Sequence, residues 1–148
     1  MNRNNQQTAS AAVLAVGAEL SRRGYDITFT LGNTRKVDML CAVPDGKQFS
    51  VQVKGVSTAN AFRIDKSFFD PPVQDALFLI VVLVPKDDHS NFSFFVLSHA
   101  EAQSEYEKLP KQKRDGTDFV PGNEGLYWSS VEGYKDAWSK LPSSTPAK

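Results

Sequence analysis

Apolar and polar residues alternate most regularly between positions 37 and 54, on both sides of a short turn. Alternation with period two is typical of β-strands. Positions 44–46 read Pro-Asp-Gly, and this triplet favours a turn because proline presets φ and glycine can adopt positive φ. The pattern therefore predicts an antiparallel hairpin in which Val43 pairs with Lys47.

This register divides the hairpin into two unlike faces. Asp38 lies opposite Gln52, and Lys36 lies opposite Lys54. The apolar face consists of Val37, Met39, Cys41, Val43, Phe49, Val51 and Val53. The other face consists of Asp38, Leu40, Ala42, Ser50, Gln52 and Lys54. The polar end of this face is explained either by a functional site or by a solvated surface with an Asp38–Lys54 salt bridge.

Helical and strand patterns flank the hairpin. Residues 9–23 predict a helix that is capped by Thr8, ends at Gly24 and carries Glu19 beside its apolar stripe. Residues 76–84 form an apolar run without alternation, which is typical of a strand buried on both faces. Further strands are expected at 25–31, 61–66, 92–97 and 126–128, and further helices at 98–108 and 129–141.

The order of these elements predicts an α/β fold with a mixed β-sheet flanked by helices. A length of 148 residues fits a single domain with one main core. We expect this domain to cover residues 9–141, between a disordered N-terminus at 1–8 and a disordered C-terminal tail at 142–148.

Composition narrows the class of protein. Seventeen basic and 17 acidic residues give a formal net charge of zero, which argues against a chain coated with cations but not against a local basic groove. The single Cys41 has no partner for an internal disulfide. The chain shows neither a signal-peptide pattern nor an apolar run of about 18 residues. We therefore expect a cytoplasmic protein with no membrane partner.

The first third of the chain resembles a known enzyme superfamily. A helix with Glu19 is followed by Arg-Gly-Tyr at 23–25, by Asp38 on a strand and by Val-Gln-Val-Lys at 51–54. This layout is similar to that of the PD-(D/E)xK nucleases, which include Holliday-junction-resolvase-like enzymes. The resemblance extends over residues 13–58 and implies a restriction-endonuclease-like fold.

Two positions depart from the common motif. Val37 precedes Asp38 where proline is frequent, and Gln52 occupies the second acidic position, as in a Gln-x-Lys variant. An amide is a neutral oxygen ligand and binds Mg²⁺ more weakly than a carboxylate does. One firmly bound metal ion is therefore expected rather than two.

The resemblance implies a metal-dependent DNA endonuclease that uses Mg²⁺ or Mn²⁺. Its metal ligands would be Asp38, Gln52 and the Val53 carbonyl, with Glu19 acting through water. Lys54 would orient the attacking water or stabilise charge at the phosphate, which makes Lys54, Asp38, Gln52 and Glu19 the catalytic set. The candidates for contacts with the DNA backbone are Arg35, Lys36, Ser57, Arg63 and Lys66.

The resemblance also bears on partners. The expected substrate is linear or branched duplex DNA. Because a cut through both strands needs two active centres, we expect a homodimer or a higher homo-oligomer.

Other functions stay open. Gln52 and the zero net charge favour a nuclease-like fold without catalysis, serving as a DNA-binding or protein-interaction module. An α/β domain whose polar hairpin face has no function is a further alternative. His89 and His99 lie on different expected elements and lack zinc-ligand spacing. Cys41 is expected on the apolar face, where it has no catalytic role.

Overall fold

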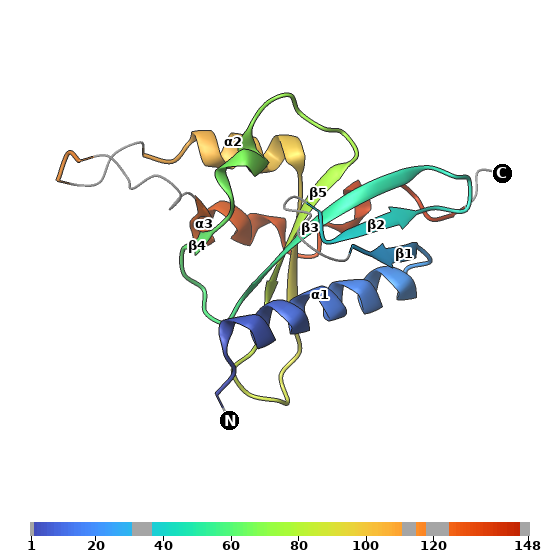
Figure 1. Cartoon of the computed structure of the whole chain (residues 1–148), viewed down its shortest axis with the longest axis horizontal. Helices are drawn as coiled ribbons and strands as arrows, with labels where there is room; N and C mark the ends of the chain where they lie inside the picture. Colours follow the sequence, from blue (N-terminus) through green and yellow to red (C-terminus); the bar gives the residue numbers. More distant parts are fainter. Residues whose placement is uncertain (1, 31–36, 111–114, 118–124, 146–148) are drawn as a thin grey trace.

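A five-stranded mixed sheet lies at the centre of the computed structural model, which describes residues 2–30, 37–110, 115–117 and 125–145 (Figure 1). The strand order is β1-β2-β3-β5-β6, and only the β3–β5 pair is parallel. The strands are β1 (Asp26–Phe29), β2 (Met39–Ala42), β3 (Gln48–Val56), β5 (Leu77–Leu83) and β6 (Ser93–Ser98).

Helices cover both faces of this sheet. Helix α1 (Asn5–Arg22) lies on one face, and α2 (His99–Glu107) and the short α3 (Trp128–Val131) lie on the other (Figure 1). A two-stranded sheet of β4 (Phe62–Arg63) and β7 (Gly125–Leu126) and three 3₁₀ helices, η1 (Lys66–Phe69), η2 (Glu132–Tyr134) and η3 (Trp138–Lys140), complete the domain. The predicted α/β class, with a mixed sheet flanked by helices, is confirmed.

The β2–β3 hairpin has the predicted register. Met39 pairs with Val51, and the Val43 N–H donates to the Lys47 carbonyl at 3.0 Å. Gly46 in the turn has a φ of 91°, a conformation that glycine reaches at little steric cost. Between these two pairs, the two-residue period therefore predicted correctly which side chains lie on each face of the hairpin.

The sheet separates two hydrophobic clusters. One lies under α1, and the other lies under α2, α3, η1 and the β4–β7 sheet. Val37 packs with the second cluster, so it does not continue the apolar face of the hairpin as predicted. The reason is that β2 begins only at Met39, and the two-residue period does not extend beyond the strand. Large fully buried side chains are Leu20, Met39, Phe49 and Ile80 in the first cluster and Leu79, Leu97 and Leu126 in the second.

Helix α1 begins earlier than expected. Asn4 is the N-cap: its side chain accepts the Gln7 N–H at 2.8 Å, and the Gln7 side chain accepts the Asn4 N–H at 2.9 Å. This reciprocal capping box replaces the predicted Thr8 cap, and Thr8 is buried inside the helix. The domain limits of 9 and 141 stay a prediction.

The single helix expected at 129–141 is not formed. Asp136, between η2 and η3, has a φ of 52°, which a right-handed helix cannot accommodate. Val131 packs on the α2 side of the sheet, whereas Trp138 packs on the α1 side. Between them Lys135 forms an isolated bridge with β6. The segment thus passes around the edge of the sheet, which one straight helix would not do.

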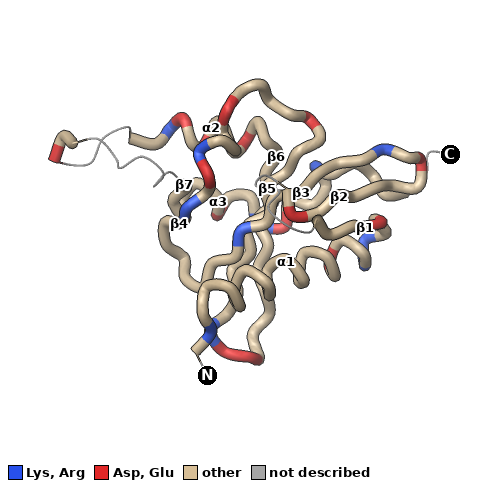
Figure 2. Tube along the Cα trace, viewed as in Figure 1, with Lys and Arg blue, Asp and Glu red and all other residues tan. Residues whose placement is uncertain are grey.

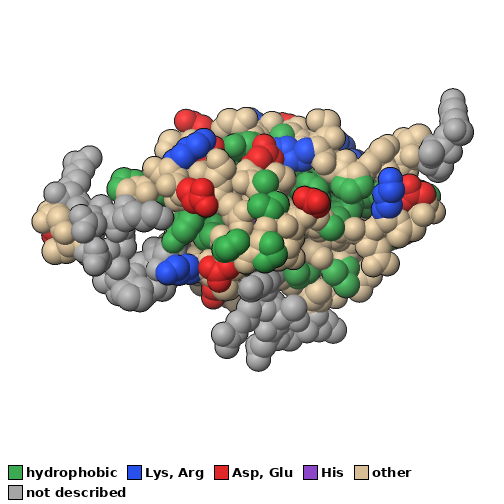
Figure 3. Space-filling view, turned by 90° about the horizontal axis from the view of Figure 1, so that it is seen from above, with side chains coloured by type: hydrophobic (Ala, Val, Ile, Leu, Met, Phe, Trp, Pro, Cys, Tyr) green, Lys and Arg blue, Asp and Glu red, His purple; other side chains and the backbone are tan. Residues whose placement is uncertain are grey.

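Charged residues are spread along the whole described trace rather than gathered on one element (Figure 2). On the face seen in the space-filling view, acidic and basic side chains are interspersed among apolar ones (Figure 3). Any preference for DNA must therefore come from a local arrangement of charges. Over the described ranges, no helix is long and apolar enough to cross a membrane.

Candidate functional site

The polar end of the β2–β3 hairpin lies where regular strand pairing stops. The ladder ends at the Met39–Val51 pair. One residue further, the Asp38 Oδ2 accepts a hydrogen bond from the Val53 N–H at 2.7 Å, in the place of a backbone acceptor. The Asp38 N–H donates to the Val51 carbonyl at 2.8 Å. These two bonds hold the carboxylate against β3.

Gln52 is the cross-strand neighbour of Asp38 when the register is continued by one step. The Gln52 Oε1 is buried and has no hydrogen-bond partner among the described residues. Leaving such an atom unpaired costs roughly 1–3 kcal/mol. In a strand the N–H and C=O of one residue point to the same edge, so the Val53 carbonyl is directed towards β2, as its N–H is. Oxygens of three residues are thus brought to one end of the hairpin.

Lys54 follows on the same face of β3 and is half-buried. Burial lowers the pKa of Lys54, and the nearby positive charge of Arg63 lowers it further. Burial also raises the pKa of Asp38, although the Val53 N–H bond opposes this shift. Opposed pKa shifts of a carboxylate and an amine in one place are typical of functional sites.

The solvated salt bridge considered for Asp38 and Lys54 is not formed. The ion pairs of the described residues lie elsewhere, in α1, the hairpin turn, the 88–89 turn and the α2 region. Neither Asp38 nor Lys54 has an oppositely charged partner within 4.0 Å among those residues. A salt bridge between Asp38 and Lys54 therefore does not explain why both side chains are half-buried.

Gln52, Val53 and Lys54 line a cleft of about 560 Å³ that lies beside the N-terminal end of α1. Asp38 is not among the lining residues, but its carboxylate accepts the N–H of Val53, which is one of them. Asp65 also lines the cleft and was not among the sequence candidates. The sequence signal that could have drawn attention to Asp65 is the Asp-x-Ser spacing with Ser67. Asp65 is the N-cap of η1, and its Oδ1 accepts the Ser67 N–H at 2.9 Å.

The five residues predicted to contact DNA do not all lie in one place. Ser57 and Arg63 line the same cleft as Lys54. Lys66 is exposed at the start of η1 and is not a lining residue. The other two, Arg35 and Lys36, lie outside the described residues.

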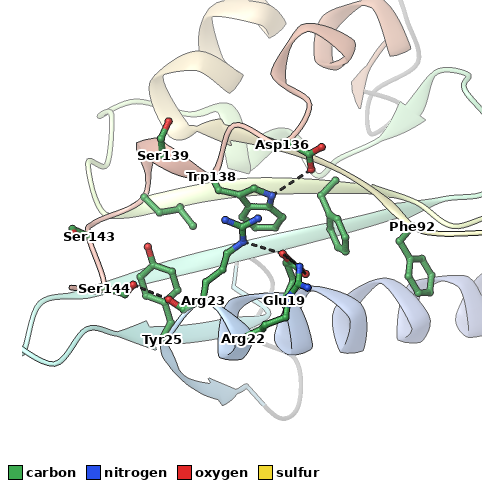
Figure 4. Close-up of a pocket in the computed structure, with 12 residues that line it drawn as sticks. Glu19, Arg22, Arg23, Tyr25, Phe92, Asp136, Trp138, Ser139, Ser143 and Ser144 are labelled. Carbon is green, nitrogen blue, oxygen red and sulfur yellow. Dashed lines mark hydrogen bonds and ion pairs between the residues drawn. The ribbon is translucent and has the colours of Figure 1, made fainter.

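Glu19 is placed elsewhere, in a second cleft of about 920 Å³ (Figure 4). Burial by itself raises the pKa of Glu19, but hydrogen bonds from Arg22 and Arg23 outweigh it and hold the pKa below its usual value. The two guanidinium groups lie 2.8 and 2.9 Å from the carboxylate. Asn5 lines the first cleft, and Glu19 lies about 20 Å further along the helix at about 1.5 Å per residue.

Helix α1 also covers the opposite face of the sheet from Gln52 and Lys54. The structure therefore brings Asp38, Gln52, Val53 and Lys54 together and leaves Glu19 apart.

Alternative metal or nucleophile sites have no support within the described ranges. No group of three His, Cys, Asp or Glu side chains there is placed to hold a metal ion. His99 is buried, with Nδ1 accepting the Gln74 N–H at 2.9 Å and Nε2 donating to the Phe68 carbonyl at 2.6 Å. Burial raises the pKa of Cys41 to about 12. These two residues are structural.

A solved structure has a similar arrangement of helices and strands. It is that of a bacterial homing endonuclease, I-Ssp6803I, at a TM-score of 0.52, with 17% sequence identity over 92% of this chain and 90% of that chain. The fold is nuclease-like. At this identity the similarity concerns the fold alone. No protein-family model matches the chain, and no curated protein matches it in sequence.

Proposed function

We propose that this protein is a metal-dependent DNA endonuclease, a Gln-x-Lys variant of the PD-(D/E)xK type. The observation that carries the proposal is the buried Gln52 Oε1, which has no hydrogen-bond partner among the described residues and lies across the hairpin from Asp38. The Lys54 ammonium, in the same cleft as Gln52, has no counter-ion within 4.0 Å among those residues. An uncompensated amide oxygen next to a half-buried carboxylate is costly for folding. A cation between the two oxygens would remove that cost. The nuclease-like fold supports this interpretation.

The donor set fits a hard divalent cation such as Mg²⁺ or Mn²⁺. The ligands would be the Asp38 Oδ1, the Gln52 Oε1 and the Val53 carbonyl, because the Asp38 Oδ2 is already bonded to the Val53 N–H. All three are oxygens, which Mg²⁺ prefers while it keeps several waters. When bound, such a cation polarises a phosphate and makes water more acidic. Glu19 is not part of this ligand set, because it lies in the other cleft.

Lys54 supplies the positive charge that the reaction needs at the phosphate. Its ammonium is half-buried and has no counter-ion within 4.0 Å in the part of the chain that the structure describes, so it is available to a phosphate oxygen. In a partly desolvated cleft this charge acts more strongly than it would in water. Arg63 and Ser57, in the same cleft, would hold neighbouring phosphates of the strand.

The test is a Lys54→Met variant assayed for nicking of supercoiled DNA with Mg²⁺ or Mn²⁺. We expect activity to fall roughly 10²- to 10³-fold, because a charge that stabilises the transition state is removed. The far-UV circular dichroism spectrum should be unchanged. Lys47→Met is the matched control, because Lys47 is an exposed lysine of the same hairpin. Full activity in Lys54→Met would refute the proposed site.

The second candidate is a nuclease-like module without catalysis, which binds DNA or a protein. It is favoured by the neutral amide at position 52, which leaves Asp38 as the single carboxylate among the three proposed ligands. Isothermal titration with Mg²⁺ and Mn²⁺ separates the two proposals. DNA or protein binding combined with no heat of metal binding at millimolar concentration would support the module.

A further inference from the structure

The face of the sheet that carries Gln52 and Lys54 is covered on one side of β3 and exposed on the other. On β5 and β6 it is covered by α2, η1 and the β4–β7 sheet. On β1, β2 and the start of β3 no described element covers it, and the Leu40 side chain is 50% exposed there. We call this surface the open face, and its residues are Asp26, Thr28, Leu40, Ala42, Gln48 and Ser50.

The other side of the same strands is held firmly. Ile27 and Cys41 point into the cluster under α1, and a Cβ added at Gly17 would lie 3.0 Å from the Ile27 Cδ1. The ribbon view shows β1 and β2 lying next to α1 and away from α2 and α3 (Figure 1). The open face is therefore the exposed side of strands whose other side packs against α1.

The open face is continuous with the candidate site. Thr28, Leu40 and Ser50 form one cross-strand row, and Asp38 and Gln52 form the next row along the strands. Successive rows on one face are about 7 Å apart, since each strand residue rises about 3.3 Å. A polynucleotide with one phosphate at Lys54 can therefore extend directly over this face.

The charges beside the face fit a polyanion. Lys54 and Arg63 lie in the cleft at its inner end. Away from the cleft the face carries only uncharged side chains and Asp26. Basic groups that hold phosphates, next to uncharged groups that contact base edges, are the usual division of a protein–DNA interface.

We infer that the open face enters the major groove of a duplex DNA substrate and reads its bases, an inference that rests on the proposed nuclease function. The groove, about 12 Å wide, admits a β-ribbon. Gln48 is suited to the adenine edge and Leu40 to the methyl group of thymine, and Asp26 can accept from the cytosine amino group. The partner is thus a duplex with A·T pairs a few base pairs from the cut.

The test uses the methyl group that distinguishes thymine from uracil. The preferred duplex is first selected from a randomised library with the wild-type protein, and binding is then measured by fluorescence anisotropy with thymine or uracil at each A·T pair. The wild type should bind the uracil duplex roughly fourfold more weakly at one position, since burial of one methyl-sized group is worth about that factor. Leu40→Ala should bind both duplexes equally.

A matched control and a second variant complete the experiment. Leu14→Ala removes a leucine of α1 that is even more exposed than Leu40, and this variant should keep the thymine preference. Gln48→Ala should lose roughly tenfold in affinity for the preferred duplex and nothing for random DNA. Arg63→Ala should instead weaken both duplexes and reduce the slope of binding against salt by about one.

Three outcomes would overturn the inference: a wild type without base preference, a Leu40→Ala variant that keeps the thymine preference, or a Leu40→Ala variant whose only change is its oligomeric state in light scattering. The last result would assign the face to a second copy of the chain. Thymine discrimination without any cutting would refute the nuclease proposal alone.

Discussion

At the scale of single residues, Asp38 and Lys54 are ionisable groups at positions where their charges contribute little to the stability of the fold. Both are half-buried, and neither has an oppositely charged partner among the described residues. Burial disfavours the charged form of each, which is why the pKa of Asp38 is raised and that of Lys54 is lowered. Function, not stability, is the better physical reason for keeping them.

Replacing Asp38→Asn should separate stability from activity. A raised pKa means that the folded state prefers the protonated acid, so Asp38 favours folding most below pH 3.8 and loses this advantage as the pH rises through its folded-state pKa. The variant should therefore be at least as stable as the wild type in urea at pH 7, and its relative gain should vanish near pH 3. Its amide oxygen can still accept the Val53 N–H.

The same Asp38→Asn variant should lose more than about 100-fold of the nicking activity, because the one carboxylate of the proposed ligand set is gone. A variant that is both unstable at pH 7 and fully active would contradict the assignment.

Gln52→Glu should strengthen metal binding. A second carboxylate beside Asp38 adds negative charge to the proposed oxygen set, and hard cations prefer charged oxygen ligands. We expect the Mg²⁺ dissociation constant to fall roughly tenfold in calorimetry and nicking to begin at lower Mg²⁺ concentration. Gln74→Glu, at an exposed loop position, is the control for added charge alone. Equal Mg²⁺ affinity in the wild type and Gln52→Glu would count against Gln52 as a ligand.

At the scale of elements, the position of α1 on β3 depends on a close backbone approach at Gly55. A Cβ there would lie 2.7 Å from the Ala12 Cβ and 2.9 Å from the Thr8 carbonyl oxygen. Neither atom can rotate away. At Gly17, by contrast, the nearest atom is Cζ of Phe29, 2.8 Å away at the end of a partly exposed ring.

Gly55→Ala should therefore destabilise the protein by about 1–3 kcal/mol in urea unfolding, as an overpacked interface does. Gly17→Ala should be near neutral, because the helix propensity of alanine offsets a small ring movement of Phe29. Because Gly55 directly follows Lys54, Gly55→Ala should also lower the nicking rate. Equal unfolding free energies for the two variants would show that α1 is free to shift on β3.

The hairpin was predictable from sequence and the C-terminal segment was not, for a physical reason. Turn residues and a two-residue period specify an antiparallel pairing locally. The apolar spacing of Val131, Tyr134, Trp138 and Leu141 fits one helical face, but these residues serve opposite faces of the sheet. Spacing along a chain cannot show that the chain will pass around an edge.

At the scale of the whole molecule, the described residues of each chain form one candidate site on one face of the sheet, so we expect two copies to be needed to cut both strands. We expect nicked circles to form first and linear DNA to appear with a rate that rises with the square of protein concentration. Light scattering should then show a dimer or higher oligomer on DNA. Linear product formed at a rate proportional to concentration, by a monomer throughout, would contradict the predicted homo-oligomer.

The sequence by itself determined the elements that depend on neighbours in the chain. These are the hairpin and its register, the buried β5 strand and the capping box that opens α2, and with them the grouping of Asp38, Gln52 and Lys54. Only the tertiary structure decided that Glu19 lies on the far side of the sheet, that Asp65 and Arg63 share the cleft with Lys54, and that no described element covers the face with Leu40. The reason is that strand pairing follows from local period and turn chemistry. Which helix covers which face depends on packing between residues far apart in the chain.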